Sequence, residues 1–138
     1  MTRENTGAVT QGINHLGLTV PDLVSAAEFF QQVLGFQQVG EKPDYPAIFV
    51  SDGHTMITLW QAKTDSPVSF NRHENIGLHH VALAVADEAT LDDLNRRLQA
   101  CGDVSVEFAP EPLGEAPYRH MMCLIPGGIR VEFIAPAG

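Results

Sequence analysis

Two histidines and one glutamate carry the clearest chemical signal in the sequence. His15 and His80 open matching segments, 15–20 and 80–85, which both read His, apolar, small, Leu, small or polar, Val. Glu132 lies in the last apolar segment of the chain. Two imidazoles and one carboxylate suit a divalent transition metal and leave coordination positions open for water or substrate. The residue types therefore predict a metal site made of His15, His80 and Glu132.

These three side chains share one face if each segment is a β-strand, because residues alternate between the two faces of a sheet. The apolar residues of the other face would pack against helices: Leu16, Leu18, Val20, Ile57, Leu59, Val81, Leu83, Val85, Val131 and Phe133. A carboxylate buried among apolar strands carries a large desolvation cost, which a metal would remove. The competing interpretation is that each histidine is a hydrogen-bonded core residue. His79 should point to the opposite face and serve packing or a supporting hydrogen bond.

The two histidine segments begin the two halves of an internal repeat. Each is followed by a helix that opens near an aspartate, Asp22 or Asp87, which can cap it. The first half predicts strands over 13–20, 36–40, 47–51 and 55–61 and a helix over 23–34. The second predicts strands over 78–85, 104–109, 118–125 and 129–135 and a helix over 88–101. The pattern indicates an α+β fold of two βαβββ modules that form a cup-shaped mixed β-sheet with helices outside.

The repeat also sets the expected domain organisation. We expect a mobile N-terminal arm over 1–11, a first module over 12–61, a linker over 62–76 and a second module over 77–138. The two modules together would form one domain over residues 12–136. The polar linker is either a plain surface connection or a cover for the mouth of a cavity, through Phe70, Arg72 and His73.

Composition and net charge limit the kinds of partner that the protein could bind and the cellular compartment in which it could work. The 138 residues are 44% apolar and 18% charged, which is ordinary for a folded protein, and the formal net charge is −9. This charge argues against nucleic acid or an anionic membrane as a partner. No run approaches the roughly 20 apolar residues that a membrane span needs. Two cysteines make no disulfide framework, so a cytoplasmic protein with reduced thiols is expected.

These motifs resemble the vicinal oxygen chelate superfamily, which includes glyoxalase I, bleomycin-resistance proteins, fosfomycin-resistance thiol transferases, methylmalonyl-CoA epimerase and extradiol dioxygenases. The resemblance covers residues 13–135 and rests on segments 13–22, 29–36, 78–85 and 128–133. It implies that His15, His80 and Glu132 occupy the family's metal positions, with a divalent ion (Zn, Ni, Co, Mn or Fe), and that the protein is a homodimer. Thr58 stands where glyoxalase I offers a fourth ligand, so one more coordination position should stay open.

The leading functional prediction is a metal-dependent, glyoxalase-like enzyme of lyase or isomerase type that chelates a small oxygen-bearing substrate. The predicted catalytic residues are Glu132 and His120, since imidazole readily takes and gives a proton near neutral pH. A solvent-facing role for His120 is the alternative. The predicted substrate-binding residues are Thr58, Trp60, Tyr118, Met122 and Arg130. Arg130 would hold an anionic substrate, or else pair with Glu132 or a nearby acid.

Three other functions compete with this prediction. An Fe(II) extradiol-type dioxygenase would use the same two histidines and one glutamate. A thiol transferase would need a cationic site, which the total of eight lysines and arginines disfavours. A non-enzymatic small-molecule binding protein, like the bleomycin-resistance members, would need no metal, and Phe49, Met56 and Trp60 would line its apolar cup.

Overall fold

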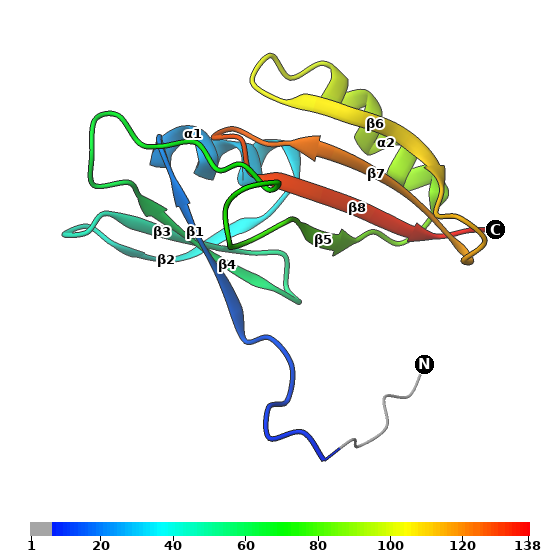
Figure 1. Ribbon diagram of the computed structural model, residues 1–138, viewed down its shortest axis with the longest axis horizontal. Coiled ribbons are helices and arrows are strands. Elements are labelled where there is room, and N and C mark those ends of the chain that lie inside the picture. Colours follow the sequence, from blue (N-terminus) through cyan, green and yellow to red (C-terminus); the bar gives the residue numbers. More distant parts are fainter. Residues whose placement is uncertain (1–6) are drawn as a thin grey trace.

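The computed structural model describes residues 7–138 and contains two modules with the same order of elements (Figure 1). The first module contains β1 (His15–Val20), α1 (Leu23–Glu28), a π-helix η1 (Phe29–Val33), β2 (Gln37–Lys42), β3 (Ala47–Ser51) and β4 (Met56–Gln61). The second contains β5 (Val81–Ala84), α2 (Glu88–Gln99), β6 (Ser105–Pro112), β7 (Tyr118–Leu124) and β8 (Arg130–Pro136). The predicted α+β class with repeated βαβββ modules is confirmed. The predicted N-terminal arm over 1–11 lies in part outside the described residues.

The strands form two separate four-stranded mixed sheets, ordered β1-β4-β3-β2 and β5-β8-β7-β6. Each sheet has one parallel pair, β1 with β4 or β5 with β8, and its other pairs are antiparallel. Figure 1 shows the sheet of the first module on the left and that of the second on the right. Within residues 7–138 no backbone ladder joins β1 to β5, so both are edge strands and the cup is built as two halves rather than one continuous sheet.

The helices cover the apolar faces of the two sheets. The face of α2 that carries Leu91, Leu94 and Leu98 is buried, as their spacing of three and four residues requires. The buried side chains of both modules form one core, which includes Leu18, Val20, Ile57, Leu59, Val131 and Phe133. These are the strand residues that alternation assigned to the helix side. The opposite residues of β1 and β5, including His15 and Ala82, are therefore left facing away from the core.

Of the differences between predicted and observed element boundaries, three change the type of an element or shift one end by three residues. The helix predicted over 23–34 changes to a π-helix at Phe29, where the Leu34 amide donates to the Phe29 carbonyl. Strand β5 starts at Val81, so His80 lies directly before it. Strand β6 extends to Pro112, into the predicted loop, because two shifts in register let Glu111 and Pro112 still pair with β7.

No helix within the described part of the chain is long and apolar enough to cross a membrane.

Candidate functional site

Glu132 is the centre of a polar cluster on the uncovered face of the second sheet. Its side chain is almost buried, with 8% of the residue exposed. Glu132 Oε1 lies 3.0 Å from His80 Nε2, and Glu132 Oε2 lies 2.6 Å from His120 Nδ1. Strand β8 lies between β5 and β7 in the sheet, so its carboxylate has one neighbour from each side. The sheet order thus brings together three of the predicted site residues.

A second set of contacts fixes the other nitrogen of His80. His79 Nδ1 lies 2.8 Å from His80 Nδ1, and Arg130 Nη1 lies 3.4 Å from the same His79 nitrogen. Arg130 also donates from Nε and Nη2 to the two carboxylate oxygens of Glu107, at 2.9 and 2.8 Å. Partial desolvation and the charge of Arg130 lower the pKa of His79. The hydrogen bond from Arg130 lowers the pKa of Glu107.

These contacts favour one tautomer of a neutral His80. A guanidinium only donates, so the His79 nitrogen that faces Arg130 is an acceptor. His80 Nδ1 must then be the donor in its bond to His79, and a neutral His80 has a bare Nε2. That bare nitrogen faces a carboxylate oxygen at 3.0 Å. Two acceptors this close repel, so the contact needs either a proton on His80 Nε2 or a cation between the two atoms.

His15 is not part of this cluster within one chain. It is exposed, and its Nδ1 lies 2.8 Å from the Asn14 side-chain oxygen. Among residues 7–138 there is no group of three or more His, Cys, Asp or Glu side chains placed to hold a metal ion. Glu132 gives one oxygen to each imidazole, so His80 and His120 do not share a metal position. Of the three predicted ligands, only His80 and Glu132 therefore lie together within one chain.

The uncovered face of the first sheet is aromatic. The Trp60 indole N–H donates to the Thr58 hydroxyl at 2.9 Å, and that hydroxyl lies 3.4 Å from the Leu16 carbonyl oxygen. Thr58 is buried, so its oxygen serves this internal hydrogen bond. The Trp60 ring packs edge-on against Tyr45, with ring centroids 4.7 Å apart, and lies 5.8 Å from Phe49. The face offers an apolar wall with little hydrogen-bonding capacity.

The remaining predicted substrate-binding residues lie in three different settings. Met122 pairs in register with Glu132 and is buried beside it. Tyr118 shares the face of His120 and Met122 but lies at the exposed beginning of β7. Arg130 binds Glu107, which agrees with the alternative that it pairs with a nearby acid.

Sequence reasoning missed two contributors to the site. Glu107 orients Arg130, and the Phe108 ring packs at 62° against His120 with centroids 5.0 Å apart. Both lie on β6, where the register shifts twice between Val106 and Glu111. Simple alternation does not carry across such shifts, so only the three-dimensional fold reveals these contacts.

Comparisons with known proteins agree with this architecture. A family model described as the Glyoxalase/Bleomycin resistance protein/Dioxygenase superfamily matches residues 12–133, and the chain belongs to this superfamily. The fold is that of a glyoxylase/bleomycin resistance protein/dioxygenase domain from Frankia sp. EAN1pec, with a TM-score of 0.78 at 21% identity over 92% of this chain and 93% of that one.

Curated relatives give more specific but shorter matches. The mouse mitochondrial methylmalonyl-CoA epimerase is 31% identical over 100 residues, which are 66% of this chain and 56% of the relative. The catechol-2,3-dioxygenase of Bacillus subtilis is 31% identical over 94 residues, which are 65% of this chain and 32% of the relative. The chain thus spans about half the length of the epimerase and about a third of the dioxygenase.

Proposed function

We propose that the protein is a metal-dependent, glyoxalase-like enzyme that chelates a small oxygen-bearing substrate at a divalent metal ion. The observation that carries the proposal is the approach of His80 Nε2 to Glu132 Oε1 at 3.0 Å on the uncovered face of the sheet. Ligand atoms that each lie about 2.0–2.2 Å from one metal are themselves roughly 3 Å apart. The donor types and their separation therefore fit a metal. Similarity to an epimerase favours lyase or isomerase chemistry.

The chain's own residues would divide the remaining work. A divalent ion, when bound, supplies Lewis acidity toward a substrate oxygen. His120 donates to Glu132 and lies beside Met122 on the same face, where it can take or give a proton at the substrate. Trp60, Tyr45 and Phe49 supply apolar surface for the rest of a small substrate. The Thr58 hydroxyl is engaged with Trp60, so it adds no ligand to the metal.

The third ligand, His15, would come from a second copy of the chain. His15 is exposed, and the uncovered faces of the edge strands β1 and β5 have no partner sheet within residues 7–138. A two-fold symmetric homodimer would bring His15 of each copy to His80 and Glu132 of the other. Each dimer would then hold two equivalent sites.

Elemental analysis of the purified protein and of His80→Ala tests the proposal. We expect one divalent metal per chain in the unmodified protein and its loss in His80→Ala, while circular dichroism stays unchanged. His54→Ala is the matched control, because His54 is an exposed turn histidine outside the cluster. Full metal content in His80→Ala would show that His80 is not a ligand, and a metal-free unmodified protein would favour a non-enzymatic binding protein.

The identity of the metal separates this proposal from its rival. The similarity to a catechol-2,3-dioxygenase favours an Fe(II) extradiol-type dioxygenase as the second candidate, since it would use the same His15, His80 and Glu132. Iron in protein purified without oxygen, together with oxygen uptake in the presence of a catechol, would support the dioxygenase. Zinc, nickel, cobalt or manganese without oxygen uptake would support the glyoxalase-like enzyme.

A further inference from the structure

A cavity of about 730 Å³ lies beside the free edge of β1, away from Glu132. We call it the linker groove, because linker residues 67–72 form one wall. Strand β1 forms the opposite wall, and His79 with residues 127–130 closes the end. Its size is within the usual range for small-molecule sites, about 300–1,000 Å³. The cluster residues His80, His120 and Glu132 do not line it.

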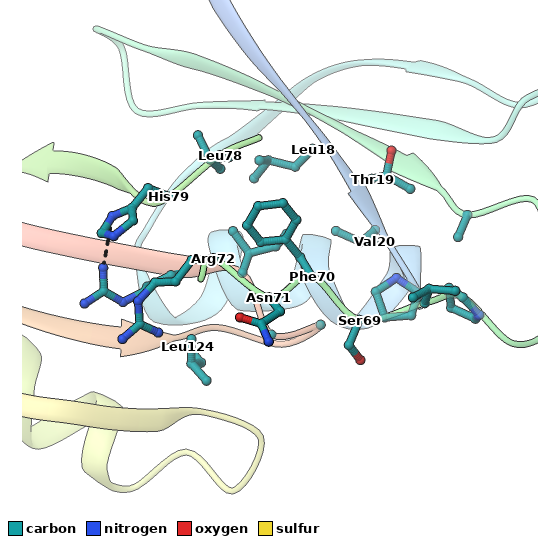
Figure 2. A pocket seen from close by; sticks show the side chains of 18 of the residues that line it. Leu18, Thr19, Val20, Ser69, Phe70, Asn71, Arg72, Leu78, His79 and Leu124 are labelled. Carbon is teal, nitrogen blue, oxygen red and sulfur yellow. Dashed lines mark hydrogen bonds between the residues drawn. The ribbon is translucent and has the colours of Figure 1, made fainter. Parts of the chain in front are cut away.

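Most of the linker groove is apolar. Figure 2 shows the Phe70 ring projecting into the groove, toward Leu18, Val20 and Leu78. Phe70 is half-exposed, so its ring is a wall that a ligand can reach. A Cβ on residue 77 would lie 2.9 Å from Phe70 Cε1, so the absence of a side chain at Gly77 makes room for this ring. These contacts provide an apolar surface with an aromatic side.

One end of the linker groove is cationic. Arg72, His79 and Arg130 line this end, with Arg72 on the same side as His79 in Figure 2. The Glu107 carboxylate forms an ion pair with Arg130 and so balances its charge. Arg72 makes no hydrogen bond or ion pair with any of residues 7–138, and its charge acts on His79 and Glu107 only through space, so its N–H donors are available to a ligand. Two guanidinium groups with one carboxylate leave a net positive charge, in a protein whose formal net charge is −9.

We propose that the linker groove binds a small amphipathic carboxylate, with its apolar body between Phe70 and β1 and its carboxylate on Arg72. A planar carboxylate matches the guanidinium fork, which can donate two parallel hydrogen bonds to it. The apolar body would cover Leu18, Leu78 and Leu124, which line the cavity. The groove adjoins the cluster around Glu132 through His79 and Arg130 but does not include His80, His120 or Glu132, and the proposal does not depend on the function proposed above.

Titration calorimetry with octanoate and with n-octanol, which has the same chain length and no charge, tests the proposal. We expect one saturable octanoate site per chain and at least roughly ten-fold weaker binding of n-octanol, since a charge-assisted hydrogen bond is worth about 1.5–3 kcal/mol. Arg72→Gln should weaken octanoate about ten-fold and leave n-octanol unchanged. Phe70→Ala should weaken both ligands.

Two controls make the result specific to the linker groove. Arg96→Gln removes an exposed arginine on α2 that pairs only with Asp93, so octanoate affinity should stay unchanged. His120→Ala should also leave it unchanged, because neither His120 nor its partners Glu132 and Phe108 line the groove. No saturable octanoate binding would overturn the proposal. Equal affinities for the two ligands, or an unchanged affinity in Arg72→Gln, would overturn the role of Arg72. Loss of binding in His120→Ala would move the ligand to the cluster around Glu132.

Discussion

Glu132 shows how a single buried carboxylate is held by its neighbours. The side chains of Arg130, His79 and His80 form, in that order, a hydrogen-bonded series that ends at the Glu132 carboxylate. Each link restricts the next, because arginine has only donors and neutral histidine has one donor and one acceptor. The chain starts at Glu107, which fixes the Arg130 fork through two hydrogen bonds. Glu107 therefore acts on Glu132 through three intervening side chains.

The Glu107–Arg130 pair gives a pH-dependent prediction at the residue scale. Arg130 lowers the pKa of Glu107 below its ordinary 4.5, so the pair stabilises the fold above that pH and loses its effect as the pH falls through the lowered pKa. Glu107→Gln should destabilise the protein at pH 7 by up to about 1 kcal/mol, since the pair is partly exposed. Urea unfolding at pH 7 and at pH 3 measures this.

The outcome at acidic pH is the decisive part of that measurement. The difference in the free energy of unfolding between Glu107→Gln and the unmodified protein should shrink on acidification, because residue 107 is then uncharged in both proteins. Glu111→Gln is a suitable control, since Glu111 lies on the same strand and forms no ion pair with residues 7–138. A difference that stays constant between the two pH values would contradict the electrostatic explanation.

Each helix has its start set by one aspartate. The Asp22 side chain accepts from the Ser25 amide at 3.2 Å, and the Asp87 side chain accepts from the Thr90 amide at 2.8 Å. Asp87 also accepts from the Thr90 hydroxyl, at 2.6 Å. Strand β1, which precedes α1, begins with the proposed ligand His15, and strand β5, which precedes α2, begins directly after the proposed ligand His80. The two caps therefore also fix where each of these strands leaves its sheet.

Removing the cap of α2 gives a prediction at the scale of the element. Asp87→Ala should lower the free energy of unfolding by about 1 kcal/mol, within the usual range of about 0.5–2 kcal/mol for such caps. Denaturant unfolding followed by circular dichroism measures it. Asp44→Ala, in an exposed loop, should change stability little. Equal stabilities for the two variants would contradict a capping role for Asp87.

The arrangement of the two modules keeps the three predicted ligands apart within one chain. The chain places His15 on one sheet and His80 with Glu132 on the other, and the two sheets share no ladder within residues 7–138. Their core-facing sides meet in one core, which leaves the aromatic face of the first sheet and the polar cluster of the second on the outside. A second copy that covers these faces would bring its own His15 over His80 and Glu132.

Mixing two inactive variants tests this assembly at the scale of the whole molecule. His15→Ala and Glu132→Ala should each lose metal, and each should keep a dimer mass of about twice 15.0 kDa by light scattering. After equimolar unfolding and refolding together, about a quarter of the metal content should return, because half of the dimers are mixed and each contains one intact site.

The alternative assembly gives a different result in the same experiment. If each site is made within one chain, no combination of the two variants contains an intact site, and mixing restores no metal. A monomeric mass at micromolar concentration would likewise contradict the dimer. Mixing His15→Ala with His15→Ala labelled by a different tag is the matched control, and it should restore nothing in either case.

The sequence by itself determined the local features of this protein. Alternation of apolar residues is a property of each strand alone, so it correctly assigned Leu18, Ile57 and Phe133 to the core. The repeat of the two histidine segments, with an aspartate before each helix, likewise predicted the order of the elements, and the resemblance of segments 13–22, 29–36, 78–85 and 128–133 to a known family indicated the superfamily. These signals are local because side-chain direction and helix capping depend on neighbours a few residues away.

Only the tertiary structure decided which polar groups meet. The contact of His120 with Glu132 depends on β7 and β8 being neighbours in a particular register, and the contact of Glu107 with Arg130 depends on the irregular register of β6. The separation of His15 from Glu132 depends on how two whole sheets pack. Such contacts join residues far apart in sequence, and their geometry follows from packing over the entire core rather than from any local pattern.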